Sequence, residues 1–270
     1  MRKFPILAAS LSLALAGSTA FADDIIQISQ TAFTAGAGLI TFSEYPTGTV
    51  NPVYAPATYG GGAGSPTVTF GGYFNGQTAG STNPGACPAG AIVSGCVLGN
   101  PTGPLAINPS SPSTFITGDS AMPTAPILSG SPTYNGPIAI KFSTPQVGVG
   151  LDGGYFDNIG STAITAYAAD GTILGSVKNS ETGDEFLGLV TADGQADISG
   201  LLFSLVGDEP AGFDIDNVEF GIQGQVTVPG GGGGTPPTGV TPEPSTLVLL
   251  GTGIVGLAST VRRRFAVAGR

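Results

Sequence analysis

Residues 138–151 read IAIKFSTPQVGVGL, and the spacing of their apolar side chains decides the fold class. Ile138, Ile140 and Phe142 alternate with smaller or polar neighbours, and residues 147–151 repeat the pattern. Successive side chains of a β-strand point to opposite faces, so this alternation predicts two strands that are each buried on one face.

Turn signals extend this pattern along the chain. Asp170-Gly171 lies between two strand-like runs and predicts a hairpin with a two-residue turn. Asp193-Gly194 precedes another run, at 196–206, and no segment of residues 23–228 shows an apolar period of 3.6 residues. Short strands separated by turns predict an all-β, antiparallel two-sheet sandwich over residues 23–228, most regular at 137–222.

The apolar residues of the last strand change phase. Phe213 and Ile215 occupy odd positions, whereas Val218 and Ile222 occupy even ones. A straight strand cannot bury both sets on one face, so one extra residue near 216–217 is needed, which predicts a β-bulge.

The predicted bulge directs Asp214, Asp216 and Asn217 towards one point, with Asp152 or Asp157 as further oxygen donors. Oxygen ligands of this kind suit Ca²⁺, although the spacing does not match an EF-hand loop. The alternative is that these side chains cap turns and face solvent. Calcium is therefore a hypothesis for this segment, and the sequence indicates no other cofactor.

Composition argues against catalysis. The chain has 270 residues with 45 Gly, 22 Pro and no His, which excludes Ser-His and Cys-His dyads and the HExxH zinc site. The remaining catalytic chemistry is that of a carboxylate pair, for which Asp184-Glu185 and Asp208-Glu209 are the candidates. Adjacent carboxylates on turns are usually solvated, so we assign no catalytic residue and expect no enzyme activity.

Charge is unevenly distributed. The net charge is −10, but six of the eight basic residues lie near the two ends. Between Asp23 and Val240 two Lys face 17 acidic residues, a net charge of −15. Phosphate backbones would repel such a domain, which argues against nucleic-acid binding.

The N-terminal residues have the pattern of an export signal. Arg2 and Lys3 precede an uncharged apolar run, and Ala20 and Ala22 frame a small-x-small cleavage site. We expect residues 1–22 to be a signal peptide used by the Sec export machinery. Cys87 and Cys96 are then exposed to an oxidising compartment and are expected to form a disulfide within long loops spanning 75–135.

The C-terminal residues change composition abruptly. Residues 229–240 are a Gly/Pro-rich linker, and an uncharged apolar segment at 246–261 follows. This segment predicts a single transmembrane helix of marginal length. Arg262, Arg263 and Arg264 then form a positive stop that places residues 266–270 in the cytoplasm.

Together, these terminal features resemble the PEP-CTERM protein-sorting domain over residues 241–265. The motif residues are Pro242, Glu243, Pro244, Ser245 and Thr246. The resemblance implies a Gram-negative exported protein that is held in the inner membrane until exosortase removes the tail. The protein would then reach the cell surface or the extracellular matrix.

The exported domain carries a more diffuse resemblance. GFDIDNVEF at 212–220, LITFSEYPTGT at 39–49 and TVTFGG at 67–72 resemble segments of jelly-roll, galactose-binding-like domains found among PEP-CTERM proteins. Five tyrosines have a loop-like context and would serve either as sugar platforms or in packing: Tyr45, Tyr54, Tyr59, Tyr73 and Tyr155.

The sequence therefore predicts a structural or adhesive protein of extracellular polysaccharide or biofilm. The alternative is a carbohydrate-binding module, with or without calcium, and the third hypothesis is a glycan-cleaving enzyme.

Overall fold

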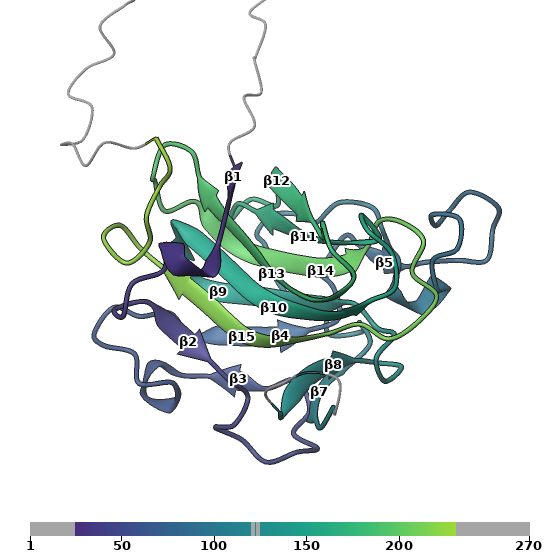
Figure 1. Cartoon of the computed structure of the whole chain (residues 1–270), viewed down its shortest axis with the longest axis horizontal. Helices are drawn as coiled ribbons and strands as arrows, with labels where there is room; N and C mark the ends of the chain where they lie inside the picture. The colour runs from purple at the N-terminus through teal and green to yellow at the C-terminus, as the bar shows by residue number, and fades with distance from the viewer. Residues whose placement is uncertain (1–24, 120–121, 123–124, 231–270) are drawn as a thin grey trace, which may run out of the picture. The chain divides into compact units, whose positions relative to one another are not determined.

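The computed structural model describes residues 25–119, 122 and 125–230, whose strands form two large antiparallel sheets and one small sheet (Figure 1). In spatial order, the first sheet contains β1 (Ile25–Ile28), β13 (Gly183–Thr191), β10 (Gly148–Phe156), β15 (Asp214–Gly221), β8 (Ile127–Gly130) and β7 (Thr114–Thr117). A further strand, β2 (Gly38–Ile40), also pairs with β15.

The second sheet lies against the first and contains β12 (Ile173–Lys178), β11 (Thr162–Tyr167), β14 (Ile198–Leu205), β9 (Ile138–Gln146), β4 (Val68–Gly71) and β3 (Val53–Tyr54). The small sheet pairs β5 (Thr78–Ala79) with β6 (Val97–Leu98). Short 3₁₀ turns occur at η1 (Gln30–Ala32), η2 (Pro56–Thr58) and η3 (Val93–Gly95). This architecture confirms the predicted antiparallel sandwich and fits a jelly roll.

The alternation at 138–151 has the predicted consequence. Ile138, Ile140 and Phe142 of β9 are fully buried, and Val149 and Leu151 of β10 face them from the other sheet in the same core cluster. The two strands thus belong to opposite sheets, and their apolar faces meet in the core between them.

Sheet exchange is the main topological feature of the second half of the chain. From β8 to β15, only β11 and β12 are consecutive strands of one sheet, because every other connection passes to the opposite sheet. Each crossing ties the sheets together, so the core is built from residues far apart in sequence.

Two local predictions need correction. The Asp170-Gly171 hairpin exists, but its last cross-strand hydrogen bond runs from Ala168 N–H to Thr172 O, so three residues, 169–171, form the connection instead of two. Asp170 Oδ1 accepts a hydrogen bond from the Thr172 N–H, and Gly171 takes a φ of 88°, which shapes this longer turn. Segment 75–135 is also not loops alone, since it contributes β7 and β8 to the first sheet.

The predicted bulge is present in β15. Gly150 of β10 pairs with Glu219 and Asp152 pairs with Asp216, so Asn217 and Val218 together oppose the single residue Leu151. Asn217 adopts a φ of 44°, in the left-handed region. Phe213, Ile215, Val218 and Phe220 consequently all reach the core. Ile222, which the phase argument also placed inside, lies beyond the strand and is exposed.

Cys87 and Cys96 are joined by a disulfide, with Cα atoms 6.0 Å apart. A backbone hydrogen bond from Ile92 N to Glu209 O holds the enclosed loop to the sandwich, and Gly80 N, directly after β5 of the small sheet, donates to Cys96 O. Gly80 leaves room for the disulfide, because a Cβ at that position would lie 2.5 Å from Cys87 Sγ.

We expect the double variant Cys87→Ala/Cys96→Ala to lose about 2–3 kcal/mol of unfolding free energy, since a crosslink of this loop size restricts the unfolded chain by that amount. Denaturant unfolding of the oxidised full chain and of the variant would measure the difference. Reductant should lower the stability of the parent and leave the variant unchanged. Equal stability of the oxidised parent and the variant would contradict this expectation.

Candidate functional sites

The bulge brings acidic side chains together on the outer face of the first sheet. Asn217 donates from Nδ2 to Asp152 Oδ2 at 2.8 Å, and its backbone N–H donates to Asp216 Oδ1 at 2.8 Å. Asp214 lies two residues earlier on the same strand, opposite Gly154 of β10. The structure thus places Asp152 beside Asn217 and brings the charge of Asp216 close to Asp214. Asp157 lies elsewhere, against Glu209.

Asp214 is the most deeply buried member of this acidic cluster, with an exposed fraction of 1%. Its Oδ1 has no hydrogen-bond partner. Burial, followed by a hydrogen bond to Asp119 and the charges of Asp119, Asp184 and Asp216, raises the pKa of Asp214 to about 9. The carboxyl is therefore protonated at neutral pH, which avoids the cost of burying another negative charge.

The pKa values of the surrounding carboxyl groups of Asp184 and Asp152 are also raised. Burial and the charges of Asp119 and Asp152 raise the pKa of Asp184. Burial also raises the pKa of Asp152, while its hydrogen bond from Asn217 lowers it. Gly154 leaves room for the Asp184 carboxyl group beside β10, since a Cβ there would lie 2.3 Å from Asp184 Oδ1.

The geometry of this cluster does not fit a metal centre. Within the described ranges, no three side chains of the His, Cys, Asp or Glu type are placed to hold a metal ion. Asn217 also acts as a hydrogen-bond donor in this cluster: its side-chain Nδ2 donates to Asp152, and its backbone N–H donates to Asp216. Calcium binding at Asp214, Asp216 and Asn217 thus stays a prediction without a ligand set to support it.

The two acidic pairs considered for glycan cleavage have separate environments. Glu209 is fully buried and accepts hydrogen bonds from the Asp157 N–H and from Ser161 Oγ. Glu185 accepts from Ser180 Oγ at 2.6 Å. Both glutamates therefore fix the conformation of neighbouring loops.

The tyrosines mostly serve in packing. Tyr54 and Tyr73 are buried, whereas Tyr45 and Tyr59 are partly buried against the core. Tyr155 is half exposed. Of the five candidates for sugar platforms, Tyr155 alone presents a large exposed surface.

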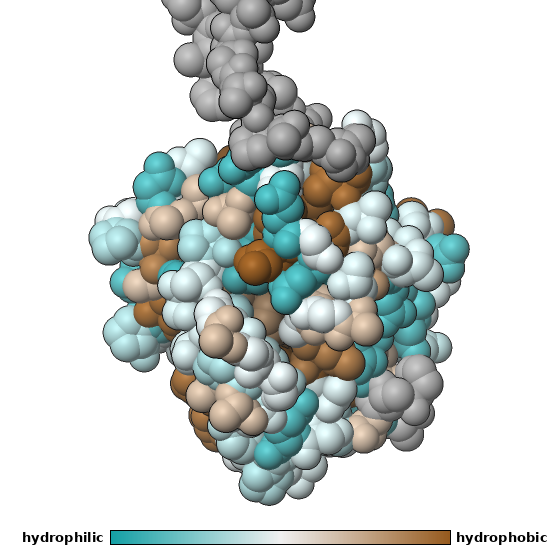
Figure 2. Space-filling view, turned by 90° about the vertical axis from the view of Figure 1, so that its left-hand side faces the viewer, coloured by the Kyte–Doolittle hydropathy of each residue, from teal (hydrophilic) through white to brown (hydrophobic). Residues whose placement is uncertain are grey.

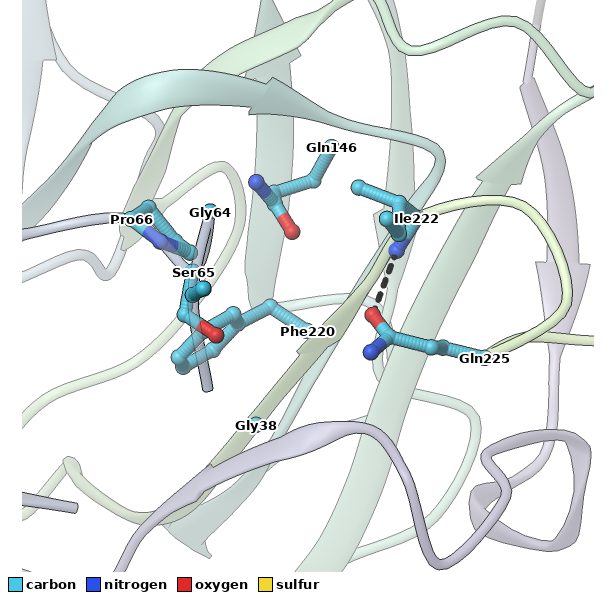
Figure 3. Close-up of a pocket in the computed structure, with 9 residues that line it drawn as sticks. Gly38, Gly64, Ser65, Pro66, Gln146, Phe220, Ile222 and Gln225 are labelled. Atoms are coloured by element: carbon cyan, nitrogen blue, oxygen red, sulfur yellow. Dashed lines mark hydrogen bonds between the residues drawn. The ribbon is translucent and has the colours of Figure 1, made fainter. Parts of the chain in front are cut away.

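A pocket opens at the end of the sandwich where β15 ends (Figure 3). The space inside it that can hold a bound molecule is about 90 Å³. We call it the Phe220 pocket, and its principal lining residues are Gly38, Ser65, Gln146, Phe220, Ile222 and Gln225. Figure 2 views the domain from this side and shows hydrophobic residues as separate patches among polar ones.

Sequence reasoning missed this pocket and also Asp119. The pocket combines neutral side chains from four separate segments, at 38, 63–66, 146 and 220–225, and such residues carry no recognisable spacing. Asp119 lies just after β7, in a segment interpreted as loop. It reaches Asp214 because β7 pairs with β8, and β8 pairs with β15.

The sorting signal can now be compared with known families. Residues 240–264 match the PEP-CTERM protein-sorting motif. This match supports a PEP-CTERM protein that is exported, anchored in the membrane and processed by exosortase. The comparison with curated proteins gave no match to this chain.

Several sequence predictions concern residues outside the described structure. These are the signal peptide with Ala20 and Ala22, the motif at 242–246, the apolar segment at 246–261 and the arginines at 262–264. Among the residues that are described, no helix has the length and apolar character needed to cross a membrane.

The raised pKa of Asp214 makes a pH-dependence prediction. An Asp in the unfolded chain has a pKa of about 4, so the contribution of Asp214 to stability is complete below that pH and is lost as pH rises towards 9. Asp214→Asn cannot ionise. We expect it to be more stable than the parent at pH 8 by at least about 1 kcal/mol, a few degrees in Tm.

Melting temperatures of the full chain at pH 5 and pH 8 would measure this effect, with the exposed Asp197→Asn as the matched control. The advantage of Asp214→Asn should shrink or disappear at pH 5. If both variants follow the pH profile of the parent, Asp214 is already ionised in the fold and its inferred protonation is wrong.

Proposed function

We propose that this chain is a surface or matrix protein with a structural or adhesive role in extracellular polysaccharide and without catalytic activity. The observation that carries this proposal is the sorting motif at 240–264, which follows the sandwich after a Gly/Pro-rich spacer. A transient anchor placed after a folded domain is the arrangement expected for a protein delivered outside the cell.

The positions of the chain ends support display of the domain. Val226 and Val228 pack in one cluster with Ile26 and Ile28, so both ends of the continuous fold lie together at one end of the sandwich. The opposite end carries the disulfide loop and the loop held by Glu209. An attachment through the spacer therefore leaves those loops free to contact other molecules.

Carbohydrate binding is the second candidate function, and the Phe220 pocket favours it. The pocket is lined by amides, a hydroxyl and apolar groups, with no ionisable side chain among its lining residues. Such a mixture is typical of small-molecule sites that orient a ligand by a few hydrogen bonds. Loss of binding on addition of EDTA would indicate that calcium takes part.

Replacing Pro242, Glu243 and Pro244 together by Ala should prevent tail removal, because the resemblance places exosortase cleavage at this motif. In a host with exosortase, cell fractionation and intact mass should show the parent starting at Asp23 and lacking residues 262–270. The variant should remain in the membrane fraction with its tail. The matched control is Pro236→Ala/Pro237→Ala in the spacer. Normal processing of the motif variant would contradict the assignment.

The proposed role also predicts where the mature protein is found. It should sediment with the extracellular polysaccharide of the producing cells and be released when the polysaccharide is digested by a glycosidase. Washing with 1 M salt should not release it, since the domain carries a strong negative charge and is not expected to adhere through charge. Recovery entirely in the free medium, with the tail removed, would argue against a matrix role.

A further inference from the structure

Residues 87–96 form a strap whose two ends are joined to each other by the disulfide between Cys87 and Cys96. We call them the disulfide strap. In sequence the strap lies between β5 and β6, which form a small sheet of their own and add no strand to either large sheet (Figure 1). The strap is therefore attached to the sandwich by its own contacts and not by strand pairing.

The strap covers an apolar end of the core. Ala91 and Ile92 are partly buried and pack against the main core cluster. Gly95 is buried, and a Cβ there would lie 2.5 Å from the Phe213 ring and 2.9 Å from Leu205 Cδ1. Phe213 and Leu205 are themselves almost fully buried, so part of their cover is supplied by the strap.

Few polar contacts hold the strap in this position. Among the described residues, its one backbone hydrogen bond to the sandwich runs from the Ile92 N–H to Glu209 O at 2.8 Å. The remaining backbone hydrogen bonds donated by strap residues close turns inside it, as from the Gly95 N–H to Ile92 O. Closure of the strap thus depends on a small apolar contact and on the crosslink between its ends.

The crosslink is open to a reductant from one side. Cys87 is partly exposed, whereas Cys96 is 2% exposed. A thiolate of a soluble dithiol can attack Cys87 Sγ, form a mixed disulfide there and release Cys96 as a thiolate that takes up a proton. The second thiol of the reductant then displaces Cys87 as its thiol. The dithiol leaves as a cyclic disulfide, and the protein holds two thiols.

Loss of the crosslink favours opening of the strap. A closed loop of this size restricts the chain once it leaves the sandwich, and the restriction disappears when the bond is reduced. Segments with few buried contacts and few hydrogen bonds open locally at a lower free energy than the core. The large sheets contain neither cysteine, so their pairing does not depend on the bond.

We infer that the disulfide strap is a redox-sensitive lid, closed over Phe213 and Leu205 when Cys87 and Cys96 are oxidised. Reduction opens the lid and exposes apolar surface at that end of the core, while both large sheets stay folded. An oxidising compartment outside the cytoplasm keeps the lid closed. This inference goes beyond the proposed matrix role and does not depend on it.

Thiol trapping tests the opening directly. The full chain is reduced with dithiothreitol, freed of the reductant and pulsed with iodoacetamide, and each cysteine is followed by mass spectrometry. Cys96 should be alkylated at a rate comparable with that of Cys87, with an unchanged far-UV circular dichroism spectrum. Alkylation of Cys87 with Cys96 still protected would show that the reduced strap stays closed and would overturn the inference. Loss of the strand spectrum on reduction would overturn it as well.

Hydrogen exchange of the Ile92 amide measures the same opening without a thiol reagent. In Cys87→Ala/Cys96→Ala this amide should exchange about ten- to hundredfold faster than in the oxidised parent. Reductant should accelerate it in the parent and leave the variant unchanged. If the Ile92 amide of the variant exchanged as slowly as the amides of β9 and β14, the strap would open only with the whole domain, and no lid would exist.

A second variant displaces the strap with its disulfide intact. In Gly95→Ala the added Cβ meets the Phe213 ring, so Ile92 exchange in the oxidised protein should rise about tenfold. Gly62→Ala is the matched control, because a Cβ at that position meets no atom within 4 Å. Equal Ile92 exchange in the two variants would show that the strap is not seated on Phe213 and would refute its role as a lid.

Discussion

The need to keep the apolar side chains of β15 on one face governs much of this structure. β15 pairs with β10, β8 and β2 in the first sheet, so its side chains meet several neighbours at once. Its sequence changes apolar phase in the middle, and the inserted residue at Asn217 and Val218 resolves the conflict. Without the bulge, either the Phe213 side or the Phe220 side of the strand would turn its aromatic residue to the outer face.

Both candidate sites follow from that single insertion. On the outer face it sets Asp214 and Asp216 beside Asp152, where burial favours the protonated form of Asp214. On the inner face it returns Phe220 to the core at the end of the strand, where the ring forms the pocket floor. Burial of acidic groups on one face and formation of a rigid floor on the other are thus two outcomes of one backbone irregularity.

The high glycine content has a structural use at these sites. Gly38 lets the Phe220 ring lie against the β2 backbone, and Gly154 leaves space for Asp184. Each glycine costs conformational entropy on folding, and here that cost is offset by close approach of a large ring or a carboxyl group. The high glycine content therefore supports close packing in the described domain.

Local pattern predicted the sandwich and the bulge well, because both depend on which face each side chain occupies. Ile138, Phe142, Val149 and Leu151 had the correct faces from sequence alone. Sheet exchange between β8 and β15 was not predictable in this way, since alternation is the same whichever sheet a strand joins. The contact of Asp119 with Asp214 and the pocket both depend on that long-range arrangement.

The pocket also lies close to where the domain is attached. Val147, next to the pocket residue Gln146, packs with Val226 shortly before the spacer, and its N–H donates to Gly221 O at the end of β15. Both ends of the continuous fold therefore lie on the pocket side of the sandwich. The disulfide loop and the loop organised by Glu209 lie at the opposite end. Attachment through the spacer at one end thus leaves the loops at the other end exposed, because the sandwich between them is a single continuous core.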